Sequence, residues 1–240
     1  MIVILQVFYA LFSAFITAAA IPNEFLSLGS PFLGLFALVP LYLSISYSHS
    51  FKNAGRIVAL QMGTVHLLTS FWLGNFKDFA IFTIGGSAMV YFIWGYFWGQ
   101  LLYIAFLYTK KLQLRERAGT IQWSIPIRIF CFAAVWTVFE WYKSYGFFAY
   151  PWGTILMSAY KWKLLSQICD ITGTWGLTFL FALFSAVFAE GLLIIRRNDF
   201  SKKYSSYANT AAFCMTLFVI SIVYGTYQFT KTRTPTKTIN

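Results

Sequence analysis

Long stretches of apolar residues, separated by short polar connections, run through almost the whole chain. A helix that crosses the hydrocarbon core of a bilayer needs about 20 mainly apolar residues. Seven stretches come close to or exceed this length, at approximately residues 2–20, 32–48, 57–74, 80–108, 127–141, 173–195 and 208–228. The pattern therefore predicts an all-α membrane protein, built as a bundle of about seven transmembrane helices.

Two of these stretches differ from a simple crossing. Residues 80–108 are too many for one straight span, so we expect either a tilted helix or a short surface segment before Gly85 and Gly86. Residues 2–20 end in three alanines, as the cleavage site of a signal peptide would, but no Lys or Arg precedes the apolar run. We therefore expect an uncleaved first helix.

The connection over residues 142–172 is too aromatic for a solvated loop and too interrupted for a span. Trp and Tyr favour the membrane–water interface, because their rings are apolar while their N–H and O–H groups keep contact with water. We expect an interfacial aromatic segment here, lying on or dipping into the outer leaflet.

Composition supports the membrane interpretation. Hydrophobic residues make up 59% of the chain and charged residues 10%, whereas about a quarter of a soluble domain is charged. The net charge of +11 fits cytoplasmic loops that face anionic lipid better than it fits nucleic acid, because no basic stripe with exposed aromatic residues is visible. Two histidines and three cysteines without a CxxC pair predict no metal site, and no cofactor is indicated.

The basic residues of the connections predict an orientation. Eleven Lys and Arg fall on the side of the chain's N-terminus, in the connections after the second, fourth and sixth stretches. Seven fall on the other side, three of them in the C-terminal tail. Because Lys and Arg are enriched in cytoplasmic loops, we expect the N-terminus in the cytoplasm and the C-terminus outside.

An ordered set of motifs occupies the second half of the chain: Trp-Thr-Val-Phe-Glu-Trp-Tyr-Lys at 136–143, Tyr-Pro-Trp-Gly at 150–153, Leu-Ser-Gln-Ile at 165–168 and Gly-Thr-Trp-Gly-Leu-Thr-Phe-Leu at 173–180. Residues 38–42 and 71–75 add weaker support. The set resembles the N-terminal membrane part of bacterial apolipoprotein N-acyltransferase. It differs at Lys143, where the family usually has Arg, and at Tyr150, where it has Phe. Lys lacks the planar fork with which Arg binds phosphate at two points.

The resemblance implies a domain order of seven helices, an extracytoplasmic nitrilase-like domain and a last helix. Residues 1–229 would form the multi-pass membrane domain, and the polar residues 230–240 a linker leading to a nitrilase-like domain that is absent from this chain. The implied location is the bacterial inner membrane. The implied partners are phospholipid, a lipoprotein substrate and a separate nitrilase-like domain.

The family reaction moves an acyl chain from phospholipid to the N-terminal cysteine of a lipoprotein, through a thioester on a cysteine that a Glu and a Lys activate. Those residues belong to the nitrilase-like domain, and no position here matches their motif. We therefore assign no catalytic residue and expect this chain to be inactive alone. Cys169 is the cysteine nearest the outer face, and we interpret it as a structural thiol.

Three residues are candidates for lining a lipid or substrate site: Glu140, Lys143 and Trp152. A carboxylate in a membrane helix is costly unless it is paired, hydrated or interfacial. Glu140 is thus either a salt-bridged anchor of the helix end or a group that orients the outer segment or meets a lipid head group. Lys143 could pair with Glu140 or with phosphate. Trp152 is either an interfacial belt residue or part of a lateral entry for acyl chains.

Two other functions stay open at this point, a non-catalytic scaffold or lipid-binding protein and a small transporter. Ion relays usually place charged residues near the middle of transmembrane helices. The apolar stretches show no charge firmly at such a position, and His66 comes nearest. The sequence therefore favours the acyltransferase platform over the transporter.

Overall fold

The computed structural model describes residues 2–23, 26–116, 122–146, 149–197 and 203–231. Within them the chain is helical and contains no strand. The α-helices are α1 (Ile2–Ala20), α2 (Pro31–Phe36), α3 (Val39–Ser46), α4 (Phe51–Thr69), α5 (Ser87–Arg115), α6 (Ser124–Tyr142), α7 (Lys163–Ser166), α8 (Cys169–Arg197) and α9 (Lys203–Thr230). Four short helical turns join them: η1 (Phe71–Asn75), η2 (Lys77–Phe79), η3 (Ile81–Gly86) and η4 (Ile155–Lys161).

All seven predicted stretches are largely helical, and the all-α membrane fold is confirmed. Five helical segments are long and apolar enough to cross a membrane: Ile2–Ala20, Lys77–Arg115, Ser124–Tyr142, Cys169–Arg196 and Ser205–Thr230. The stretch at 32–48 is divided between α2 and α3, and α4 carries several polar residues. Crossing of the bilayer by these two parts stays a prediction.

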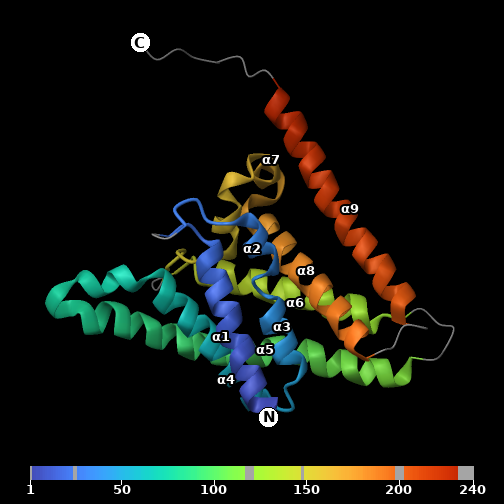
Figure 1. The fold of residues 1–240 in the computed structure, drawn as a ribbon, viewed down its shortest axis with the longest axis horizontal. Coiled ribbons are helices and arrows are strands. Elements are labelled where there is room, and N and C mark those ends of the chain that lie inside the picture. Colours follow the sequence, from blue (N-terminus) through green and yellow to red (C-terminus); the bar gives the residue numbers. More distant parts are fainter. Residues whose placement is uncertain (1, 24–25, 117–121, 147–148, 198–202, 232–240) are drawn as a thin grey trace.

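Of the two expectations for residues 80–108, the structure shows a change of helix type before α5, and whether this part lies at the membrane surface stays a prediction. The π-helical turn η3 ends at Gly86, and α5 begins at Ser87. Figure 1 shows η1, η2 and η3 extending the hairpin of α4 and α5 outward from the side of the bundle. There η3 lies opposite η1, and Thr83 Oγ1 donates to the carbonyl oxygen of Leu73 at 2.7 Å. The predicted linker at 230–240 falls almost entirely outside the described residues, since α9 ends at Thr230.

Small residues let α4 and α5 pack closely, and this pair shares the most extensive contact between elements in the described structure. A Cβ atom on Gly95 would lie 2.7 Å from the Cα of Ala59, and one on Gly99 would lie 2.6 Å from the carbonyl oxygen of Ala54. In a membrane the hydrophobic effect does not drive helices together, because lipid tails are as apolar as the helices. Close backbone packing of this kind is therefore a main source of helix association.

Polar side chains fix α1 in the bundle. The buried amide of Gln6 donates hydrogen bonds to the carbonyl oxygen of Ser44 (3.1 Å) and to Oδ1 of Asn53 (3.0 Å). Ser13 Oγ donates to the carbonyl oxygen of Ala37 at 2.7 Å. These bonds join α1 to α3, α4 and the turn between α2 and α3. That this helix is not cleaved stays a prediction.

A buried ion pair joins three helices. Arg128 Nε of α6 lies 2.6 Å from Glu190 Oε1 of α8, and Tyr42 Oη of α3 donates to the same oxygen at 2.6 Å. Arg128 lies near the start of α6 and Glu190 in the last third of α8, so the pair does not contradict the expectation of no charge at a helix centre. Its burial and its pairing were not predicted. The two partners are 62 residues apart in sequence, so no local pattern pairs them. Arg128 was one of the eleven basic residues counted on the N-terminal side, but it lies inside α6 and is buried rather than in a connection.

Removing one member of this pair should cost more than removing both. A buried charge that loses its partner costs about 3–5 kcal/mol, whereas an apolar replacement of the whole pair is often close to neutral. We expect Glu190→Leu to lower the free energy of unfolding by about that amount, and the double variant Arg128→Leu/Glu190→Leu to lower it much less. Titration with sodium dodecyl sulfate, followed by circular dichroism, measures both. An equal loss of unfolding free energy in the single and the double variant would contradict a stabilising interaction between Arg128 and Glu190.

Candidate functional site

The α6–α8 connection (residues 143–168, of which 147 and 148 are not described) folds back onto the end of the bundle (Figure 1). Its turn η4 buries Ile155, Ser158 and Ala159. The segment was expected to be an interfacial, aromatic one, and its apolar side chains are indeed divided between the bundle and the surface. Polar groups from α4, α5, α6 and α8 decide how it is held.

Glu140 is the central group of this arrangement. It is only 1% exposed. Its Oε1 accepts hydrogen bonds from the Ile155 backbone N–H (2.9 Å) and from Trp136 Nε1 (3.3 Å), and its Oε2 accepts one from Thr178 Oγ1 (3.2 Å). Three donors around one buried carboxylate compensate much of its lost hydration. The side chain thereby ties α6 to η4 and α8.

Lys143 follows Tyr142, the last residue of α6, and is also buried. Its Nζ donates to the carbonyl oxygens of Trp152 (3.4 Å) and Gly153 (3.2 Å). The same ammonium lies 5.6 Å from the ring centroid of Phe139 and 5.9 Å from that of Tyr91. The described structure contains no ion pair between Lys143 and Glu140, so the direct pairing considered from the sequence is not formed. Both residues instead hold the connection.

Residues 152 and 153 dock on the end of α4. Trp152 Nε1 donates to the carbonyl oxygen of Thr69 at 3.0 Å. Gly153 has φ +70°, and a Cβ there would lie 2.8 Å from Thr69 Oγ1. A residue with a side chain would therefore be strained by both its backbone and its neighbour. This explains the glycine in the Tyr-Pro-Trp-Gly motif.

Aromatic residues surround the preceding turn. Tyr150 Oη donates to Ser70 Oγ at 2.9 Å, and Tyr91 Oη donates to the carbonyl oxygen of Tyr150 at 3.1 Å. The ring of His66 stacks on Tyr91 with the centroids 4.2 Å apart, while its Nε2 lies 2.8 Å from Ser87 Oγ. Burial raises the pKa of the Tyr150 hydroxyl, and the hydrogen bond with Ser70 opposes the increase. The tyrosine therefore stays a neutral hydrogen-bond donor.

A small cavity of about 20 Å³ adjoins Glu140 and Lys143. Gln61 lines it, is fully buried, and has no hydrogen-bond partner among the described residues for either amide atom. A cavity of roughly this size can hold one water molecule. A water bound there would give the Gln61 amide the partner that it otherwise lacks.

Trp152 faces a larger and more apolar pocket of about 320 Å³. The pocket is lined by Ile21, Pro22, Trp152, Leu156, Met157, Tyr160, Ser166, Cys169 and Leu177. Cys169 thus lies where an acyl chain could reach it, but no described basic side chain is hydrogen-bonded to its sulfur. Trp152 lines this pocket. Glu140 and Lys143 do not line it, but their hydrogen bonds hold the segment that carries Trp152.

Several residues of the site were not identified as such from the sequence, among them Gln61, His66, Tyr91 and Thr178. Thr178 lies inside the motif at 173–180, so that motif was the available signal for it. Gln61 and Tyr91 sit on α4 and α5, and only the tertiary packing of those helices brings them to the connection. The spacing of residues along the chain does not predict such contacts.

Comparison with known proteins gives the family. Residues 13–187 match the family model described as the apolipoprotein N-acyltransferase N-terminal domain. The chain is 40% identical over 95% of its length to apolipoprotein N-acyltransferase 2 of Treponema pallidum, and 38% identical over 87% to apolipoprotein N-acyltransferase 2 of Treponema denticola. It matches apolipoprotein N-acyltransferase of Borreliella burgdorferi at 28% identity over 77%.

The matches cover 37%, 35% and 32% of these three relatives, so the chain spans about a third of their length. The matched residues run from the second half of α1 into α8 and include Glu140, Lys143 and Trp152. On this similarity, the chain belongs to the family of apolipoprotein N-acyltransferase N-terminal domains.

Proposed function

We propose that this chain is the membrane platform of an apolipoprotein N-acyltransferase, the enzyme that transfers an acyl chain from phospholipid to the N-terminal cysteine of a lipoprotein. The observation that carries the proposal is the apolar pocket beside Trp152, held in place by the Glu140 and Lys143 hydrogen bonds. An apolar pocket at the end of a membrane bundle is suited to receive an acyl chain directly from the bilayer.

Each of the three candidate residues has a specific part in the proposal. Trp152, which is 44% exposed, would contact the acyl chain. Glu140 and Lys143 act as positioning residues, because their polar atoms are already bound to protein groups. A phosphate head group would instead meet the exposed Lys161 and Lys163, which belong to the same connection. The Lys-for-Arg difference at position 143 then has little consequence for phosphate binding.

The acyl transfer itself needs a cysteine nucleophile with an activating base, and we assign these groups to a nitrilase-like domain. Helix α9 packs against α7 of the connection, with Gly225 in contact with the backbone of Leu164. A domain placed after α9 would therefore be delivered to the end of the bundle that holds the pocket. A non-catalytic lipid-binding scaffold is the alternative that this arrangement also allows.

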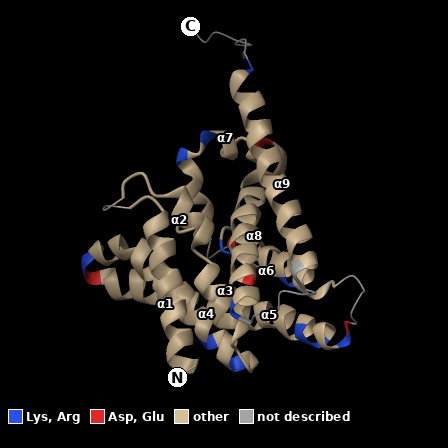
Figure 2. Ribbon diagram, turned by 45° about the vertical axis from the view of Figure 1, so that its right-hand side comes forward, with Lys and Arg blue, Asp and Glu red and all other residues tan. Residues whose placement is uncertain are grey.

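The same proposal sets the location and orientation. The bacterial inner membrane supplies phospholipid, and the extracytoplasmic face is where lipoproteins are modified. Figure 2 shows basic segments gathered at the end of the bundle near the N-terminus and at the far end of α5, with a smaller group beside α7. This distribution supports a cytoplasmic N-terminus.

The activity test uses the chain alone and in a chimera. The purified chain, given phospholipid and a diacylated lipopeptide, should yield no N-acylated product above a lipid-only control. A chimera in which it replaces the corresponding first third of the Treponema pallidum relative should be active. Trp152→Ala should lower the rate of the chimera at limiting phospholipid about tenfold, for a loss of roughly 1.4 kcal/mol of apolar contact.

Trp123→Ala is the matched control, because Trp123 is an exposed tryptophan at the opposite end of α6. It should leave the rate unchanged. Turnover by the isolated chain would refute the assignment of the chemistry to another domain. A folded but inactive chimera would favour the scaffold.

Reporter fusions test the orientation. Alkaline phosphatase, which is active only outside the cytoplasm, should be active when fused after Asn240 and inactive when fused after Glu116, in the connection between α5 and α6. An expressed but silent fusion at Asn240 would count against seven crossings with the N-terminus inside.

A further inference from the structure

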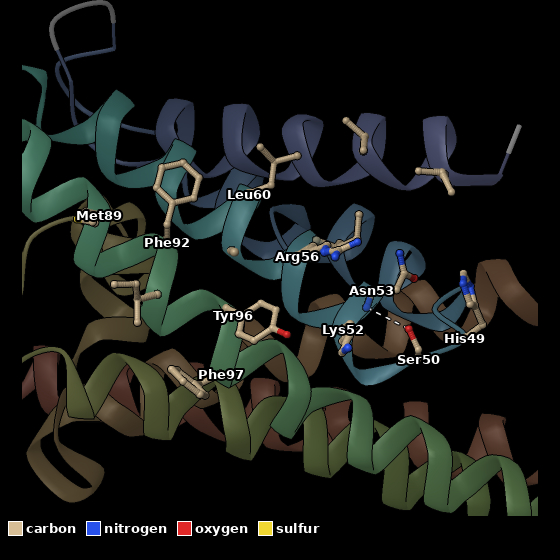
Figure 3. Close-up of a pocket in the computed structure, with 15 residues that line it drawn as sticks. His49, Ser50, Lys52, Asn53, Arg56, Leu60, Met89, Phe92, Tyr96 and Phe97 are labelled. Atoms are coloured by element: carbon tan, nitrogen blue, oxygen red, sulfur yellow. Dashed lines mark hydrogen bonds between the residues drawn. The ribbon is translucent and has the colours of Figure 1, made fainter.

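A second and larger groove lies at the other end of the bundle, between α1, α4 and α5 (Figure 3). Val3 and Val7, near the start of α1, line it, whereas Ile21 and Pro22, just beyond the end of α1, line the Trp152 pocket. The two sites are thus separated by the length of α1. The groove has a volume of about 1040 Å³, which is at the upper end for sites that bind small molecules.

One end of this groove is polar and basic. Figure 3 shows His49, Lys52 and Arg56 together at this end. Both Lys52 and Arg56 are exposed, and neither forms an ion pair in the part of the chain that the structure describes. The residues lining the groove include no carboxylate. The basic end therefore has charge to offer an anion and no protein group that neutralises it.

The start of α4 adds a second attraction for an anion. Helix α4 begins at Phe51, and Ser50 caps it by accepting a hydrogen bond from the Asn53 backbone N–H at 3.2 Å. Its first turn contains no acidic residue and carries Lys52. A cation near a helix N-terminus is opposed by the helix dipole, while an anion is favoured there by the dipole and by the free N–H groups. A bound phosphate would relieve this conflict.

The other end of the groove is apolar. Leu60 of α4 and Met89, Phe92 and Phe97 of α5 line it. Met89 is 63% exposed and Phe97 61% exposed, so no described element covers them. Phe92 is fixed against Gly63, where a Cβ would lie 2.5 Å from its ring. This half of the groove therefore has an apolar surface on which a hydrocarbon chain could lie.

We propose that this groove binds one anionic phospholipid. The phosphate would lie between Lys52, Arg56 and the N-terminus of α4, and an acyl chain would lie along Leu60 and Phe92. A phospholipid fits because it carries a negative group and a long apolar chain in the same order as the groove carries its basic and apolar ends. The lipid would join α1 to the α4–α5 hairpin, away from the Trp152 pocket, and is distinct from an acyl donor.

Native mass spectrometry of the full chain in mild detergent tests the proposal. Phosphatidylglycerol should remain bound at one copy per protein, at least tenfold more tightly than phosphatidylcholine with the same acyl chains. Lys52→Gln/Arg56→Gln should reduce that affinity at least tenfold. The control Lys110→Gln/Lys111→Gln removes the same charge from exposed positions near the end of α5 and should leave it unchanged.

A second pair of variants tests the apolar half. Met89→Gln should weaken phosphatidylglycerol binding severalfold, whereas Met215→Gln, at an exposed position on α9, should not. Equal loss in a variant and its control would show general lipid contact around the bundle and overturn the site. Displacement of the lipid by millimolar inorganic phosphate, with no effect of Met89→Gln, would show an anion site only and would also overturn it.

Discussion

A carboxylate inside a membrane bundle has to be surrounded by donors, and at Glu140 this requirement shapes one end of the molecule. Its oxygens accept hydrogen bonds from α6, from η4 and from α8. If the α6–α8 connection moved away, the buried carboxylate would lose the donor at Ile155 while still surrounded by apolar groups, which is costly. Lys143, three residues later, holds the preceding part of the connection by two carbonyl oxygens. The position of Trp152 and its pocket follows from these bonds.

Elsewhere in the bundle, buried charges are also compensated by protein groups, and small residues allow close packing. Arg128, near the start of α6, and Glu190 of α8 compensate each other, and Tyr42 joins α3 to the pair. Between α4 and α5, close packing at Gly95 and Gly99 replaces polar contact. Each buried charge in the described helices thus has a protein partner, which fits a static platform better than a path for ions.

The two ends of the bundle differ in character. The Trp152 end is apolar and closed by the folded connection, whereas the end near the start of α1 is basic and open along α4 and α5. In the function that we propose, the Trp152 pocket would take an acyl chain from one leaflet. A lipid bound in the basic groove would hold the opposite end of the bundle in position.

The sequence predicted the features that depend on local composition. Apolar length located the helices, and Gly85 and Gly86 marked the lead-in to α5. The division of 32–48 into α2 and α3 was missed, although Pro40 in the first turn of α3 was a signal for a new helix start.

The partners of the charged residues could not be predicted. Glu190 meets Arg128 across 62 residues, and Gln61 reaches the Glu140 cavity from a separate helix. Such pairings depend on how the helices pack together, and no periodicity within one helix records them. Lys143 was recognised as important, but its carbonyl partners at Trp152 and Gly153 were not.

Hydrogen–deuterium exchange at the backbone amide of Ile155 tests the central claim most directly, because this N–H is the donor that joins the connection to Glu140. In the intact protein in lipid nanodiscs, the amide should exchange as slowly as the buried turns of α6, and Glu140→Leu should make it exchange far faster. Rapid exchange in the unaltered protein, comparable with that of the exposed turn η2, would show that the carboxylate does not hold the connection.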